Sequence, residues 1–229
     1  ERDQLFWHES LNGLPEPLFK HKYSQHGALQ IPKAIIHRFT LSRAFYAQLS
    51  TWASDRRVTT YHLLLTGLCL YFSRTQQKSA FTLGIPGLNR RGARFKKLVG
   101  MCASISPLVV ALESSDSLHS LVKKMSVAIL KTHKHQRYPL TAIHKRLNAL
   151  KRKRDPLFDI VFSYERQDYS RALGDANVQA RQFFSGVARY PFAVTICEFN
   201  DEHDVEIVFE GAENYFSSDD LRLLAGRFR

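Results

Sequence analysis

The sequence has no apolar run long enough to cross a bilayer. Its longest, from Tyr61 to Phe72, is far shorter than the roughly 20 residues that a transmembrane helix needs, and it is interrupted by His62 and Thr66. The first residues do not form the apolar segment of a signal peptide. We therefore expect neither secretion nor a membrane anchor.

Cysteine is also scarce. Cys69, Cys102 and Cys197 are widely spaced, no CxxC pair occurs, and each lies in an apolar segment where a reduced thiol acts as a small hydrophobic side chain. This pattern is typical of a reducing compartment, so we expect a cytoplasmic protein. His133 and His135 diverge in direction and have no Cys or carboxylate nearby to complete a ligand set, so we predict no metal site.

Acidic residues are outnumbered by basic ones. The chain has 33 Lys and Arg against 21 Asp and Glu, which gives a formal net charge of +12. An anionic partner must therefore be considered, whether nucleic acid, a membrane surface or an acidic protein. Nucleic acid is disfavoured, because no recognisable binding signature interleaves aromatic with basic residues. A hydrophobic content of 44% over 229 residues is enough for a substantial globular core.

The most specific stretch runs from Phe81 to Val110. The segments Phe81 to Ile85 and Leu98 to Leu112 are typical of buried strands, and Pro86-Gly87 ends the first of them. The polar loop between them lies at a sheet end, where ligand-contacting loops are common. Its residues are Asn89, Arg90, Arg91, Arg94, Lys96 and Lys97. A solvated connection is the alternative, and spacing alone favours it.

Periodicity and caps predict the other elements. Helices are expected at 3–11, from Ser42, from Thr59 or Thr60 to Arg74, from Asp116, from Tyr138, and from Ser217 or Ser218; strands are expected at 33–40, 157–164, 192–199 and 205–209. Trp52 is expected in the core. In the strand 157–164, alternation separates Phe158, Phe162 and Tyr164, expected on the core side, from Ser163. The order of these helices and strands along the chain predicts an α+β fold, a two-layer α/β sandwich with one mixed sheet.

Three segments carry a family resemblance. GIPGLNRR…LVGMCASISPL, HQRYPL at 135–140 and DPLFDIVFSYE at 155–165 resemble the condensation domains of non-ribosomal peptide synthetases. The resemblance implies the CoA-dependent acyltransferase-like fold, named after chloramphenicol acetyltransferase, with two lobes and a tunnel between them. It covers 1–229 but only the C-terminal lobe, with 1–32 as a lead-in and 33–229 as the sandwich. The family's HHxxxDG motif belongs to the first lobe.

No two histidines are adjacent in this sequence, so we assign no catalytic residue and expect the chain alone to be inactive. The family's reaction joins two thioesters in an amide bond, each carried on the phosphopantetheine arm of a carrier protein. The implied partners are donor and acceptor carrier proteins and the N-terminal lobe, with no covalently bound cofactor. A non-catalytic docking module for carrier proteins is the alternative.

Two sets of residues are candidates for these roles. Where the family's strand usually has Asn and Arg, this sequence has Ser104 and Val109, which puts the usual polar contact in doubt. The expected tunnel-lining residues are Met101, Ser104, Ser106, Asp159 and Ser163. The expected carrier-docking residues are Arg90, Arg91, Arg94, Lys96, Lys97, Lys151, Arg152, Lys153 and Arg154.

Overall fold

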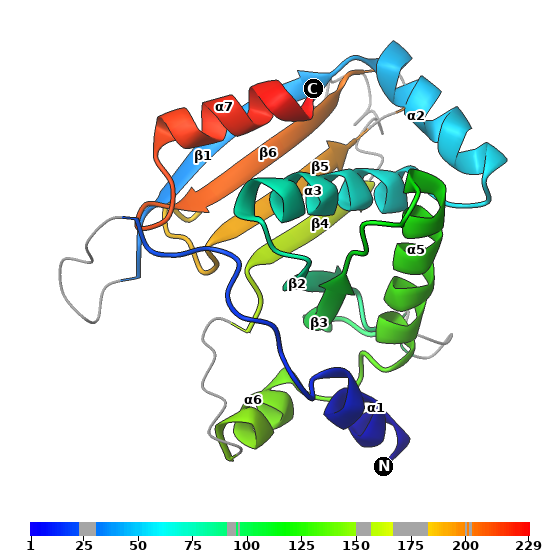
Figure 1. Ribbon diagram of the computed structural model, residues 1–229, viewed down its shortest axis with the longest axis vertical. Helices are drawn as coiled ribbons and strands as arrows, with labels where there is room; N and C mark the ends of the chain where they lie inside the picture. Colours follow the sequence, from blue (N-terminus) through cyan, green and yellow to red (C-terminus); the bar gives the residue numbers. More distant parts are fainter. Residues whose placement is uncertain are drawn as a thin grey trace. The chain divides into compact units, whose positions relative to one another are not determined.

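The computed structural model (Figure 1) describes residues 1–22, 31–90, 95, 97–149, 157–166, 183–199, 201 and 203–229. In chain order its elements are α1 (Arg2–Ser10), β1 (Ala34–Leu41), α2 (Arg43–Asp55), α3 (Thr60–Gln76), β2 (Ala80–Gly87), β3 (Ser104–Ala111), α5 (Leu118–Lys134), α6 (Leu140–Ala149), β4 (Ile160–Arg166), β5 (Phe192–Glu198), β6 (Val205–Ala212) and α7 (Ser218–Phe228). No helix in these ranges combines the length and hydropathy of a bilayer span.

The described strands form one six-stranded sheet in the order β1-β6-β5-β4-β2-β3. β2 pairs with β4 in parallel, whereas β2 with β3, β1 with β6 and β5 with β6 are antiparallel. The sheet is therefore mixed, and the predicted α+β class is confirmed. The chain divides into two compact units, Glu1–Leu18 with Cys69–Val161 and Phe19–Leu68 with Phe162–Arg229.

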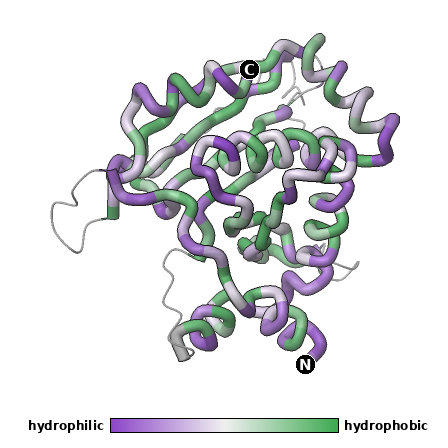
Figure 2. Tube along the Cα trace, viewed as in Figure 1, coloured by the Kyte–Doolittle hydropathy of each residue, from purple (hydrophilic) through white to green (hydrophobic). Residues whose placement is uncertain are grey.

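The first unit is built on the β2–β3 hairpin. Its register runs from Ala80 opposite Ala111 to Gly87 opposite Ser104, and Leu83 of β2 is aligned with Ile160 of β4. The hairpin is mainly hydrophobic in Figure 2. β3 is shorter than the predicted strand Leu98 to Leu112, because pairing can begin only where β2 ends, at Gly87.

Helix α5 covers the hairpin in the first unit (Figure 1). Its buried face includes Leu121, Val122, Met125 and Ile129, whereas Leu118 is exposed. The predicted cap was wrong by one residue. Ser117 caps the helix by accepting a hydrogen bond from Ser120 N at 3.2 Å, and Asp116 instead pairs with Lys124 at 2.7 Å.

Within the first unit, side chains of helix α1 contact His135, which lies just after α5. The Trp7 indole Nε1 donates to His135 O at 2.9 Å, and the His135 ring contacts Asp3 Oδ1 through Nδ1 at 2.7 Å. The Phe6 ring stacks on the same imidazole with centroids 4.1 Å apart. Since Trp7 is also fully buried, α1 has one defined position on the unit.

In the second unit, α7 lies along β1 and β6 (Figure 1). The Phe39 and Phe209 rings pack edge to face at 5.0 Å, and Phe228 of α7 packs on Phe209 at 5.8 Å. A capping box starts α7, with Ser217 Oγ accepting from Asp220 N and Asp220 Oδ2 accepting from Ser217 N. This confirms the predicted cap.

Trp52 was wrongly expected in the core. It is half-buried, with the Arg56 guanidinium 4.2 Å from its ring centroid, and Tyr46 and Ala53 are the buried residues of α2. The predicted cap of this helix is confirmed, since Ser42 Oγ accepts from Phe45 N at 3.3 Å. A cation above an indole face is stabilising at a partly exposed site, and this contact lets Trp52 remain outside the core.

Both edge strands of the sheet, β1 and β3, carry a feature that hinders pairing with a further strand. β3 is an edge strand, and it contains Pro107, which has no backbone N–H. At the β1 edge, the start of the strand is covered by a short segment, with Ala34 N donating to Gly186 O at 3.0 Å and Ala188 N donating to Pro32 O at 2.9 Å. Both devices are common on edge strands.

The alternation expected in β4 can be tested with Phe162 and Ser163. Phe162 is fully buried and lies 5.5 Å from the Tyr61 ring, whereas Ser163 and Tyr164 are half-buried. We expect Phe162→Ala to lower the free energy of unfolding by about 3 kcal/mol or more, and Ser163→Ala to leave it nearly unchanged. Thermal melts of the two variants measure this. Equal melting temperatures would contradict the assignment of faces.

Candidate functional site

The end of the β2–β3 hairpin brings Ser104 and Ser106 to the helix-covered side of the sheet. Ser104 lies opposite Gly87 and therefore shares its face, and a Cβ on Gly87 would lie 2.4 Å from the Gln136 Oε1 atom, just beyond α5. A larger residue at this position would have to displace the end of the Gln136 side chain. Ser106 is buried, and Ser104 Oγ is a buried atom with no hydrogen-bond partner in the described part of the chain.

The loop that follows β2 is held by Arg90. Its guanidinium donates to Leu98 O and, at 2.5 Å, to Gly100 O. Arg90 therefore shapes the loop, whereas Lys97 is exposed to solvent. Leu88, Val99 and Met101 are the most exposed large apolar side chains beside them. The remaining candidate docking residues, Arg91, Arg94, Lys96, Lys151, Arg152, Lys153 and Arg154, lie outside the described residues.

Asp159 has an internal role that the sequence did not indicate. It is 2% exposed, and its Oδ1 atom accepts from Leu18 N at 2.9 Å. Thus the five tunnel candidates differ in environment, with Asp159 and Ser106 buried, Ser104 and Ser163 half-buried and Met101 fully exposed. Whether they line a tunnel stays a prediction.

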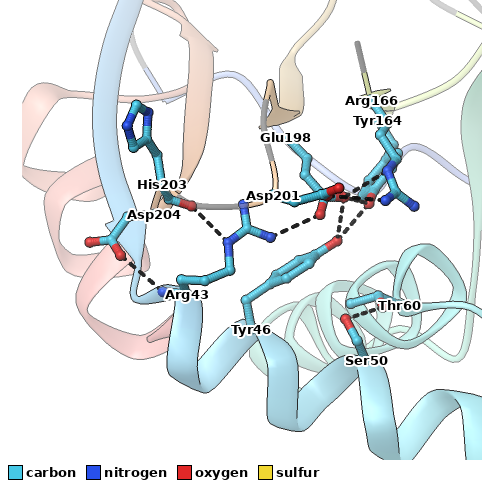
Figure 3. Close-up of polar contacts among 10 residues, drawn as sticks. All are labelled: Arg43, Tyr46, Ser50, Thr60, Tyr164, Arg166, Glu198, Asp201, His203 and Asp204. Atoms are coloured by element: carbon cyan, nitrogen blue, oxygen red, sulfur yellow. Dashed lines mark hydrogen bonds and ion pairs between the residues drawn. The ribbon is translucent and has the colours of Figure 1, made fainter. Parts of the chain in front are cut away.

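A polar cluster in the second unit centres on Glu198, at the end of β5 (Figure 3). Glu198 is 5% exposed and accepts hydrogen bonds from Arg43 Nη1 at 2.9 Å, from the Tyr46 hydroxyl at 3.1 Å and from the Tyr164 hydroxyl. The two tyrosine oxygens are 2.5 Å apart. Helix α2, β4 and β5 therefore meet at one carboxylate.

Arg43 extends this cluster to the segment after β5. Its backbone N donates to Asp204 Oδ1 at 2.9 Å, and its Nε donates to His203 O at 2.7 Å (Figure 3). Arg166 pairs with Asp201 at 3.1 Å on the exposed side. Because Arg43 is the first residue of α2, these contacts fix where that helix begins.

The charges in the cluster are set by burial and hydrogen bonding. Burial acts to raise the pKa of the Glu198 carboxyl, but hydrogen bonds from Tyr164, Arg43 and Tyr46 outweigh it and hold that pKa below its usual value. Burial, followed by the bond to Glu198, raises the pKa of Tyr164. Near neutral pH the carboxylate is therefore ionised and the tyrosines are protonated, an arrangement suited to holding structure rather than to moving protons.

Sequence reasoning missed Glu198. The available signal was a charged residue ending the apolar strand FAVTICE, because a buried carboxylate needs partners. The partners themselves were hidden, since Tyr46 lies 152 residues away in the chain.

Comparison with known proteins gives the family. The condensation-domain family matches residues 1–229, and the chain belongs to it. Surfactin synthase subunit 1 of Bacillus subtilis (strain 168) is 22% identical over 230 residues, covering 99% of this chain and 6% of that protein. Tyrocidine synthase 3 of Brevibacillus parabrevis is 22% identical over 193 residues, covering 83% of this chain and 3% of that protein.

Solved structures agree on the fold. The first condensation domain of the CDA synthetase superposes with a TM-score of 0.82 at 19% identity, over 99% of this chain and 49% of that one. The condensation domain of the Monacolin K polyketide synthase gives a TM-score of 0.81 at 14% identity, over 99% and 55%. The predicted acyltransferase-like fold is thus confirmed. The chain spans about half the length of these solved chains and less than a tenth of the two synthases.

The Glu198 cluster makes stability depend on pH. The pKa of the Glu198 carboxyl is lower in the folded than in the unfolded chain. The ionised carboxylate therefore stabilises the fold fully at pH values above its ordinary pKa of 4.5. This stabilisation is lost as the pH falls through the lowered pKa of the folded chain. We expect Glu198→Gln to reduce stability at pH 7 by about 1–3 kcal/mol and to flatten the loss in acid. Urea unfolding at pH 7 and across the acid range measures both.

Glu206→Gln is the matched control. Glu206 pairs with Arg38 at 3.3 Å where both side chains are more than a third exposed, so its replacement should cost less than about 1 kcal/mol. Equal losses in the two variants would contradict the role given to Glu198.

Proposed function

We propose that this chain is the C-terminal lobe of a non-ribosomal peptide synthetase condensation domain. It would form the tunnel wall and the carrier-docking surface for amide-bond formation between carrier-bound thioesters. The observation that carries the proposal is the family match over the whole chain together with coverage of about half of each solved condensation-domain chain. The synthetase context is supported by relatives such as surfactin synthase and tyrocidine synthase 3.

The proposed reaction depends mainly on alignment. The acceptor amine attacks the donor thioester carbonyl, a C–N bond forms as the C–S bond breaks, and the released thiolate takes up the proton that the amine loses. Holding two long phosphopantetheine arms in line supplies much of the rate of such a step. The HHxxxDG motif does not occur in this sequence, so this lobe's part would be to position the arms and exclude water.

The proposed partners are donor and acceptor carrier proteins and the N-terminal lobe, in the cytoplasm. The basic charge of +12 supports this, because an excess of one sign speeds encounter with partners of the opposite sign. The second candidate, a non-catalytic docking module, is favoured by the lack of adjacent histidines. Activity after reconstitution separates the two.

The first test is condensation by the purified chain. We expect no dipeptidyl product when it is incubated with loaded donor and acceptor carriers, and product once an N-terminal lobe of the family is added. Without that lobe, water competes for the thioesters and the reacting atoms lose their alignment. Mass spectrometry of the carrier-bound species measures the product. Product from the chain alone would overturn the proposal, and no product after mixing would favour the docking module.

The second test compares two basic clusters of equal charge. One variant replaces Arg91, Arg94, Lys96 and Lys97 with Gln, leaving Arg90 because it holds its loop; the other replaces Lys151 to Arg154. We expect at least one variant to associate more slowly with a cognate carrier protein and to depend less on salt, without losing binding. Stopped-flow association at two ionic strengths measures this. Unchanged rates at low salt would exclude the altered cluster.

A further inference from the structure

A cavity of about 340 Å³ lies between α1 and α6 in the first unit. Its floor is apolar and consists of buried side chains, and its edge is polar and reaches solvent. The floor residues are Trp7, Leu11, Ile143 and Leu147, and the edge residues are His8, Glu9, Asn12 and Arg146. The volume falls at the lower end of the range of small-molecule sites.

The α1 wall of this cavity is held in place by contacts to His135. Trp7 is fixed by its hydrogen bond to His135 O, and α1 is held by the Asp3 contact to the same histidine. On the other wall, Ile143 and Leu147 are four residues apart on α6, so they present one continuous apolar face. A ligand would therefore enter a site that is already formed, which lowers the entropic cost of binding.

Arg146 gives the site its charge preference. No ion pair or hydrogen bond of its side chain is found among the described residues, and it is exposed. It follows Ile143 by three residues, so the two side chains lie on the same side of α6. Glu9 also lies on the edge, but it is two residues from Trp7 and therefore on a different side of α1 from that floor residue. Arg146 is therefore a cation on the α6 edge of the cavity, beside the floor residue Ile143.

Arg146 also acts electrostatically on the opposite wall. Burial, and after it the charge of Arg146, lowers the pKa of His8. The positive field of the guanidinium therefore reaches across the mouth of the cavity. An anion seated there would be attracted by Arg146 and would in turn favour the protonated form of His8.

We propose that the α1–α6 cavity binds a small apolar carboxylate, with its hydrocarbon body on the Trp7, Leu11, Ile143 and Leu147 floor and its carboxylate on Arg146. The planar guanidinium matches a carboxylate in a two-point hydrogen-bonded pair. All the residues belong to one unit, so this binding does not rest on the condensation activity proposed above.

Intrinsic fluorescence tests the proposal directly, because the chain has two tryptophans and Trp52→Phe leaves Trp7, in the cavity, as the reporter. The probes share one body and differ in charge: 3-phenylpropanoate, 3-phenylpropanol and 3-phenylpropylamine. We expect saturable binding of the carboxylate at least about tenfold tighter than of the alcohol, with the amine weakest. Absence of a saturable change, or equal binding of amine and carboxylate, would overturn the proposal.

Arg146→Met in the same Trp52→Phe background identifies the anchor. We expect it to remove the preference for the carboxylate over the alcohol while leaving alcohol affinity and the melting temperature unchanged. Lys145→Met is the matched control, because Lys145 is the exposed neighbour on α6 and does not line the cavity. An equal effect of both substitutions would mean a general charge effect and would contradict the assignment.

A second readout uses His8. Because a bound carboxylate offsets the charge of Arg146, saturating 3-phenylpropanoate should raise the pKa of His8 in an NMR titration, whereas the alcohol should not. A His8 pKa unaffected by saturating carboxylate would place the ligand elsewhere.

Discussion

The parallel pairing of β2 with β4 is the constraint on which the first unit depends. β2 is hydrogen-bonded on both sides, and Gly84 at its centre lies so close to its neighbours that a Cβ would be 2.7 Å from the Phe158 ring and 2.9 Å from Ile105. Parallel neighbours cannot be joined by a tight turn. The chain between them therefore passes through β3, leaves the sheet through α5 and α6, and returns in β4.

In the second unit, a cluster of polar side chains around Glu198 joins the elements. Glu198 gathers side chains from α2 and β4 at the end of β5, in a site almost closed to solvent. A buried ion pair adds little net stability compared with a well-packed apolar cluster, but losing one partner is costly because the other charge stays buried. The cluster therefore acts mainly to specify where α2 starts.

Local patterns in the sequence were sufficient to predict the type and order of the helices and strands. The buried face of α5 and the caps at Ser42 and Ser217 follow from spacing and hydrogen-bonding chemistry within a few residues. Trp52 was misplaced because periodicity cannot foresee Arg56 covering its ring. The Glu198 cluster was out of reach for a related reason, since its members come from three elements far apart in the chain.

The family resemblance supplied what the residues alone could not. From charge and spacing, the loop around Arg90 could be either a solvated connection or a ligand-contacting loop. In both cases Arg90 has a structural role, because it donates hydrogen bonds to Leu98 O and Gly100 O. Asp159 illustrates the limit of the resemblance. A residue named for a tunnel wall is also a buried acceptor for Leu18 N, a contact that no motif encodes.

Pro107 has a consequence for the behaviour of the chain in concentrated solution. A strand approaching the open side of β3 would find no donor at this position, and the outer side of β1 is already partly occupied by the segment around Gly186. Growth of the sheet by addition of further chains is the first step of most β-type aggregation. At high concentration we therefore expect exposed apolar side chains such as Val99 and Met101, rather than strand addition at these two places, to dominate association.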